Sequence, residues 1–152
     1  MNFNQAIVFE IRLNIVPEPK QSTKFTRSGF AYTPRNKADY QNAIKQAVMN
    51  SKDLPEKPLD CPLLIEVVFG FPINESDLST KKKREFFSWN DKWLFANSKR
   101  NDLDNLLKPV ADALNKVVIA DDGLIVKSDL TKIKVERPFI EIKLYKLSYL
   151  GD

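Results

Sequence analysis

Alternating hydrophobic and polar positions predict four strands in this chain. The alternation has a period of two over residues 7–16 and 63–71, which is typical of strands. Two further runs, 124–135 and 139–147, also indicate strands and are separated by residues 136–138, and the second of them alternates clearly. We expect the last two runs to form a hairpin that closes a sheet, and the very hydrophobic 63–71 run to be a central strand.

Apolar residues recur at three- and four-residue spacing in two other segments, so we expect helices over 34–49 and 104–116. Asp104 or Asn105 is the expected N-cap of the second helix. Its apolar face would hold Leu106, Leu107, Val110, Ala113, Leu114 and Val117. The opposite face would hold Asp104, Lys108, Asp112 and Asn115 or Lys116. Pro109 cannot donate to the carbonyl of Asn105, so this helix must start near Asn105 or kink.

These elements predict one α+β domain over residues 1–152, with a mixed β-sheet packed against helices. A chain of 152 residues with 43% hydrophobic content can bury a single core. No apolar run approaches the roughly 20 residues that span a bilayer, and the amino terminus lacks a signal pattern. We therefore expect a soluble, cytoplasmic protein.

Composition narrows the chemistry that the chain can perform. Histidine is absent, which excludes serine and cysteine triads with histidine, histidine-dependent nucleases and histidine metal sites. Cys61 is the only cysteine, which excludes an internal disulfide and a cysteine zinc site. The formal net charge of +4 is compatible with a polyanionic partner. Carboxylates and lysines are the remaining candidates for catalysis.

Four aspartates and a lysine gather around the second predicted helix. Asp102 and Asp104 lie at its start, and Asp121 and Asp122 follow the apolar run 117–119. If that run pairs back into a sheet, the two groups of acids meet beside Lys108. Carboxylates within roughly 4–6 Å repel one another unless they share a cation, and a set of oxygen ligands suits Mg²⁺ or Mn²⁺. Such a pocket favours metal-assisted phosphodiester hydrolysis, with Lys108 placing a positive charge near a phosphate.

Each of these residues also has a simpler explanation. Asp102 or Asp104 can be an ordinary N-cap, and Lys108 can be a solvated partner of Asp104. Asp122 and the following glycine form a strong turn signal. A cap needs one acid and a turn needs one aspartate, whereas the chain supplies two at each place. The combination therefore favours a site.

The residues in this region resemble the RusA family of Holliday junction resolvases, endonucleases common in bacterial prophages and phages. The resemblance rests on Asp102-Leu103-Asp104-Asn105-Leu106-Leu107-Lys108, then Asp112-Ala113-Leu114-Asn115, then Asp121-Asp122. It implies that Asp102, Asp104 and Asp122 are metal-binding catalytic acids and that Lys108 is an essential lysine. It further implies a Mg²⁺-dependent homodimer, with Mn²⁺ able to substitute, that nicks four-way DNA junctions symmetrically in recombination and repair. Asn101 stands where the family often has proline.

Several cations are candidates for contacting DNA. They are Lys20, Lys24, Arg27, Lys81, Lys82, Lys83, Arg84, Lys99 and Arg100. Those between residues 20 and 27 lie in a segment without clear periodicity, which can equally be a solvated loop. The run over 81–84 precedes Phe86, Phe87, Trp89 and Trp93, a mixture suited to nucleic acid. Its simpler explanation is a short helix with a solvated basic face and an aromatic face packed on the core. Lys132 and Lys134 extend the phosphate-binding surface or lie on a solvated strand face.

Two other functions compete with the nuclease. A non-catalytic module that binds branched DNA with the same fold is the main alternative, although acids that repel phosphate are unfavourable in a protein that only binds DNA. A calcium-binding loop starting at Asp102 fails on spacing. Its sixth residue is Leu107 where glycine is needed, and its twelfth is Ala113 where glutamate is needed.

Overall fold

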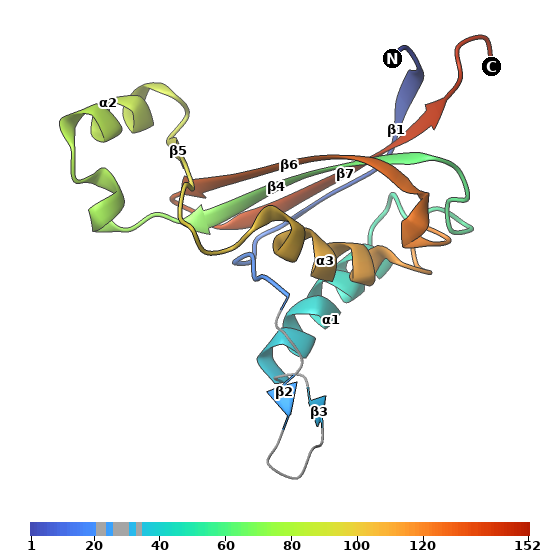
Figure 1. Cartoon of the computed structure of the whole chain (residues 1–152), viewed down its shortest axis with the longest axis horizontal. Helices are drawn as coiled ribbons and strands as arrows, with labels where there is room; N and C mark the ends of the chain where they lie inside the picture. Colours follow the sequence, from blue (N-terminus) through green and yellow to red (C-terminus); the bar gives the residue numbers. More distant parts are fainter. Residues whose placement is uncertain (21–23, 26–30, 33–34) are drawn as a thin grey trace.

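The computed structural model describes residues 1–20, 24–25, 31–32 and 35–152 (Figure 1). The strands are β1 (Asn4–Leu13), β2 (Lys24–Phe25), β3 (Ala31–Tyr32), β4 (Leu63–Pro72), β5 (Trp93–Phe95), β6 (Ile125–Val135) and β7 (Phe139–Ser148). The α-helices are α1 (Arg35–Met49), α2 (Lys81–Trp89) and α3 (Leu103–Leu114), and the short 3₁₀ helices are η1 (Glu75–Leu78) and η2 (Asp122–Leu124). None of the helices in the described residues is long and apolar enough to cross a membrane.

The main sheet has five strands in the order β1-β7-β4-β6-β5. β4 pairs in parallel with β6 and antiparallel with β7, so the sheet is mixed and β4 is central, as predicted. The predicted hairpin of β6 and β7 is wrong, because β4 lies between them. Adjacent strands are only about 4.8 Å apart, so the short connection over residues 136–138 can reach across the end of β4.

One face of this sheet packs against α1 and α3 (Figure 1). The core between these layers contains Ile65, Val67 and Phe69 of β4, all completely buried. α3 contributes four residues that are at most 1% exposed, namely Leu106, Val110, Ala113 and Leu114. This arrangement confirms the predicted α+β class.

The opposite face of the sheet carries charged side chains. Arg12 pairs with Glu141 at 3.3 Å, and Lys143 lies 3.7 Å from the same carboxylate. That carboxylate, followed by more distant acids, raises the pKa of Lys143. The guanidinium of Arg12 also lies 3.8 Å from the centre of the Phe139 ring. Ion pairs and a cation–π contact thus connect the side chains on this face, which no helix covers in the described part of the chain.

β1 departs from the predicted alternation. A bulge between Ile7 and Phe9 shifts its register against β7. Phe9 and Leu13 are buried as expected, but Ile7 is 50% exposed and Val8 packs against the core in its place. One extra residue in a strand reverses the faces on either side of it, which a simple period of two cannot indicate.

The helices follow the predicted segments with shifted ends. α3 begins at Leu103 with Asp102 at the N-cap position, so the predicted caps at Asp104 or Asn105 are wrong. It ends at Leu114 because Asn115 turns to extended backbone. α2 is a short helix that begins at the basic run 81–84, as the simpler explanation of that run predicted, with Thr80 as its N-cap and Phe87 as its buried residue.

Pro109 lies inside α3. Because proline has no N–H, the backbone carbonyl of Asn105 lacks its usual donor within the helix, and it has another partner. The backbone N–H of Lys20 donates to the carbonyl of Asn105 at 2.7 Å. Tyr40 of α1 lies against Glu18 in the same segment, and burial raises the pKa of its hydroxyl to about 12. The chain at residues 18–20 is therefore held between α1 and α3, and the helix continues through the proline.

We expect Gly70→Ala to destabilise the fold by about 1–3 kcal/mol, because a methyl group there overfills the sheet face. A Cβ at Gly70 would lie 2.7 Å from two ring carbons of Phe139, its partner on β7. Urea unfolding measures the change. In a Phe139→Ala background the same substitution should cost much less, and an equal cost in both backgrounds would contradict this explanation.

Candidate active site

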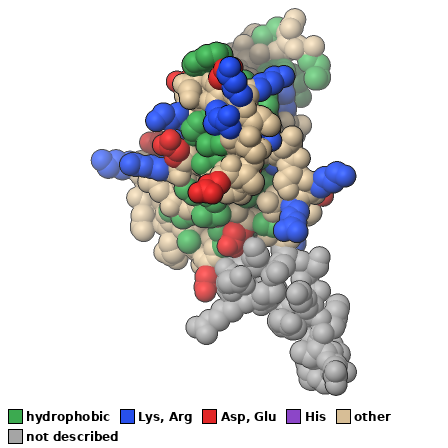
Figure 2. Space-filling view, turned by 90° about the vertical axis from the view of Figure 1, so that its left-hand side faces the viewer, with side chains coloured by type: hydrophobic (Ala, Val, Ile, Leu, Met, Phe, Trp, Pro, Cys, Tyr) green, Lys and Arg blue, Asp and Glu red, His purple; other side chains and the backbone are tan. Residues whose placement is uncertain are grey.

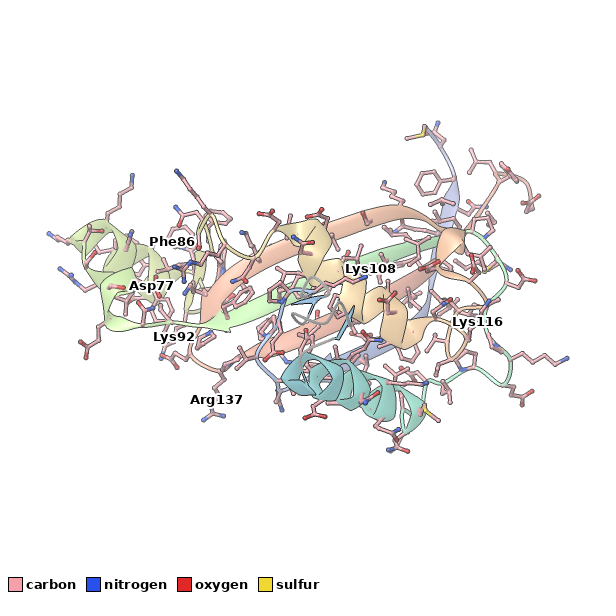
Figure 3. All side chains as sticks on the ribbon, turned by 60° about the horizontal axis from the view of Figure 1, so that its bottom comes forward. Asp77, Phe86, Lys92, Lys108, Lys116 and Arg137 are labelled. Atoms are coloured by element: carbon pink, nitrogen blue, oxygen red, sulfur yellow. The ribbon has the colours of Figure 1, made fainter. Side chains whose placement is uncertain are left out.

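The polar face of α3 presents Asp104, Lys108 and Asp112 at four-residue intervals. The ammonium group of Lys108 lies 3.3 Å from Oδ1 of Asp112, one turn along the helix. It also lies 3.8 Å from Oδ2 of Asp122, which belongs to η2 beyond the end of α3. The side chains of Lys108, Asp112 and Asp122 are 45%, 29% and 38% exposed, so solvent reaches all three. Figure 3 labels Lys108 on α3.

The two consecutive aspartates after α3 have different roles. Oδ2 of Asp121 accepts a hydrogen bond from the N–H of Gly123 at 2.9 Å, so Asp121 caps η2. The N–H of Asp122 donates to Oδ1 of Asn115 at 3.1 Å, and this bond helps to orient Asp122 towards Lys108. The turn thus uses one aspartate, and the carboxylate of the other faces the lysine.

The apolar run 117–119 brings Asp122 back to α3 by a route that we did not predict. It does not join the main sheet but forms an isolated bridge with Leu59. The N–H of Leu59 donates to the carbonyl of Val118 at 2.7 Å, and the N–H of Ala120 donates to the carbonyl of Leu59 at 2.8 Å. Val118 and Ile119 are completely buried, which anchors this return of the chain.

Asp102 and Asp104 lie at the start of α3. Asp102 occupies the N-cap position, yet its exposed side chain makes no capping hydrogen bond within the described part of the chain. Asp104 is exposed in the first turn, where the helix dipole favours an acid. It precedes Lys108 by one turn, about 6 Å along the helix axis. No three acidic side chains among the described residues are placed to hold a metal ion together.

Comparison with known proteins agrees with these features. Residues 14–145 match the family described as Endodeoxyribonuclease RusA. The chain belongs to the RusA endodeoxyribonuclease family. It is also 30% identical over 102 residues to the uncharacterized protein YqaN of Bacillus subtilis (strain 168), a match covering 67% of this chain and 70% of that protein. The family assignment makes the chain a nuclease, a hydrolase that acts on DNA.

Lys132 of β6 organises the loop that leads into α3 of this RusA-family chain. Its ammonium group donates to the carbonyl oxygens of Ser98, Arg100 and Asn101 at 3.1, 3.3 and 3.2 Å. Asn101 has a φ of 62°, which proline cannot adopt, so this chain needs a different residue where the family often has proline. Lys132 therefore positions the backbone immediately before Asp102.

The predicted DNA-contacting cations lie in three regions. Lys20 is exposed beside α3, and Lys99 and Arg100 are exposed in the loop before it. Lys81 to Arg84 are exposed on α2. Arg27 lies outside the described residues, and only the backbone of Lys24 is described. Lys134 pairs with Asp77 at 3.5 Å and is only 22% exposed.

Three contributors to the site were not assigned from the sequence: Asp112, Asn115 and Lys132. Asp112 and Asn115 fall within the quoted motif at four and seven residues after Lys108, so helical periodicity places them on its side of α3. The sequence placed Lys132 on a phosphate-binding surface or a solvated strand face, whereas its ammonium group donates to backbone carbonyls of a distant loop, a role that has no signal in sequence.

Lys132→Met should release the loop before α3 while keeping the aliphatic part of the side chain. We expect the free energy of unfolding to fall by about 1–2 kcal/mol, because the charged donor to three partly solvated carbonyls is lost. Amide exchange at residues 98–102 should speed up, and DNA cleavage should fall. The exposed Lys146→Met is the matched control, and unchanged exchange in Lys132→Met would contradict the positioning role.

Proposed function

We propose that this protein is a Mg²⁺-dependent crossover junction endodeoxyribonuclease, which resolves four-way DNA junctions by symmetric paired nicks in recombination and repair. The observation that carries the proposal is the contact of Lys108 with Asp122 on the α3 face that also carries Asp104. This arrangement occurs in a chain of the RusA family. Asp102 lies at the start of the same helix and completes the proposed catalytic set.

Lys108 is the proposed contact for the scissile or a neighbouring phosphate. Its ion pairs with Asp112 and Asp122 are partly exposed, and such pairs are weak, so a phosphate oxygen can compete for the ammonium group. Without substrate, the ion pairs with these two carboxylates hold the ammonium group of Lys108 in place. A fixed positive charge at this place stabilises negative charge that develops on the phosphoryl oxygens.

Asp102, Asp104 and Asp122 are the residues that would hold Mg²⁺, and Mn²⁺ would bind in the same way. Their donors suit it in kind, because Mg²⁺ takes oxygen ligands and is commonly bound by one or two carboxylates, with waters and substrate phosphate oxygens completing the shell. A cage of three carboxylates is therefore not required. The bound ion would supply activation of water and neutralisation of phosphoryl charge.

A four-way junction has two-fold symmetry, and two equivalent nicks call for two equivalent active sites. We therefore propose that the active form is a homodimer. Lys20, Lys99 and Arg100 would contact the DNA backbone around each site, since they are exposed on the segments next to the start of α3.

Asp122→Asn should abolish metal-dependent nicking of a strand-labelled synthetic four-way junction. Its effect on thermal stability should be small, because the lost ion pair is partly exposed. Asp121→Asn is the matched control one residue away, since an asparagine oxygen can still cap η2, and it should cleave like the wild type. A linear duplex of the same sequence should remain intact.

The result can also favour the alternative of a non-catalytic module. Tight junction binding by the wild type without nicks in Mg²⁺ or Mn²⁺ would support that alternative. Nicking that persists in Asp122→Asn would instead remove Asp122 from the catalytic set.

The proposed dimer predicts a solution mass of twice 17.5 kDa by sedimentation equilibrium at the concentrations used for cleavage. Cleavage at protein concentrations where only monomer sediments would contradict the requirement for two sites in one assembly.

A further inference from the structure

A second candidate binding site lies between α2 and β5, at one end of the molecule (Figure 1). A hollow of about 530 Å³ opens there, in the size range of small-ligand sites. Its lining includes Lys82, Lys83, Phe86, Phe95 and Asn97. We call it the α2–β5 hollow. None of the candidate catalytic side chains lines it.

Aromatic rings form the apolar part of this hollow. Phe86 and Trp93 meet edge to face with ring centres 5.1 Å apart, and Trp93 and Phe95 do so at 4.9 Å. Phe95 is nevertheless 67% exposed. The Phe95 ring thus has two aromatic neighbours, Trp93 and, with ring centres 6.2 Å apart, Phe86. Because it is mostly exposed, it adds little burial to the core and is available to contact a ligand.

Cations surround these rings, and the four basic residues at the start of α2 are not equivalent. Lys81 pairs with Glu85 at 3.8 Å, and a guanidinium nitrogen of Arg84 donates to the carbonyl of Leu78 at 2.9 Å. Lys82 and Lys83 line the hollow instead. Figure 2 shows lysine and arginine side chains near exposed hydrophobic ones on the face that carries α2.

The acid in the lining is already neutralised. Asp77 lies near Phe86 at the α2 end of the molecule (Figure 3). Its carboxylate is 3.5 Å from the ammonium group of Lys134. Lys82 and Lys83 therefore give the hollow a net positive charge, which favours an anionic ligand with a flat apolar part.

We propose that the α2–β5 hollow binds an unpaired nucleotide of a DNA strand. The base stacks on Phe95, Lys82 and Lys83 contact the flanking phosphates, and the side-chain amide of Asn97 hydrogen-bonds the edge of the base. A paired base in a duplex hides its faces, whereas an unpaired base offers one for stacking. The proposal rests on the chain acting on DNA and is independent of which junction it cuts.

The test measures binding of a fluorescein-labelled oligothymidylate to the full-length protein in EDTA, where no metal-dependent cleavage occurs. Phe95→Ala should weaken binding at least about fivefold, the lower end of the effect of losing one stacked base. Phe95→Leu should weaken it similarly, because leucine keeps an apolar side chain without an aromatic face. Phe95→Trp should bind oligothymidylate with the affinity of the wild type, because tryptophan keeps an aromatic face.

The lysines provide a matched comparison within one helix turn. The double variant Lys82→Ala/Lys83→Ala should weaken binding and lower the slope of log affinity against log salt by roughly 1.4, about 0.7 for each phosphate contact. Lys81→Ala should weaken oligothymidylate binding less than either single variant, Lys82→Ala or Lys83→Ala, because Lys81 pairs with Glu85 outside the hollow.

Equal oligothymidylate affinity in Phe95→Leu and the wild type would overturn the proposal. Thermal melting should show that the Phe95 variants remain folded, since this side chain is mostly exposed. Asp122→Asn should retain oligothymidylate binding, because Asp122 does not line the hollow. Loss of junction cleavage in that variant with oligothymidylate binding retained separates the two sites. A wild type that never nicks would overturn the nuclease proposal alone.

Discussion

The hydrophobic packing of α3 on the sheet determines where the candidate catalytic groups stand. Leu106, Val110 and Leu114 are completely buried, so the helix has one possible rotation about its axis. That rotation turns Lys108 and Asp112 outward. The buried pair Val118 and Ile119 then returns the chain towards the helix, and the ion pair of Lys108 with Asp122 follows from these two apolar contacts.

Pro109 allows the same helix to bind a second segment of the chain through its backbone. An ordinary residue would use the carbonyl of Asn105 within the helix, whereas proline leaves it to the N–H of Lys20. A segment distant in sequence is thereby attached beside the acids at the helix start. Lys132 acts from the other direction, since its contacts with three carbonyls hold the loop before Asp102. The polar site is thus assembled by backbone groups as much as by side chains.

The sequence predicts elements whose signal is local. Periodicity identified the outward face of α3 and the central place of β4, and the order of acids around Lys108 identified the family. Periodicity does not reveal which strand lies beside which, so the insertion of β4 between β6 and β7 was missed. β5 was also missed, because three residues are too few to show a period. The distinct roles of Asp121 and Asp122 depend on backbone hydrogen bonds that have no signature in sequence.

The position of β7 has a consequence for how the chain becomes a nuclease during synthesis. β7 is the last of the five strands in chain order, yet it lies between β1 and β4. Until it emerges from the ribosome, β1 has no partner in the main sheet and β4 lacks one of its two. Pairing over such long sequence separations is slow to form. The α1–α3 layer therefore has no complete sheet to pack on until β7 has been synthesised, so we expect the core beneath the candidate site to form only after this last strand is added.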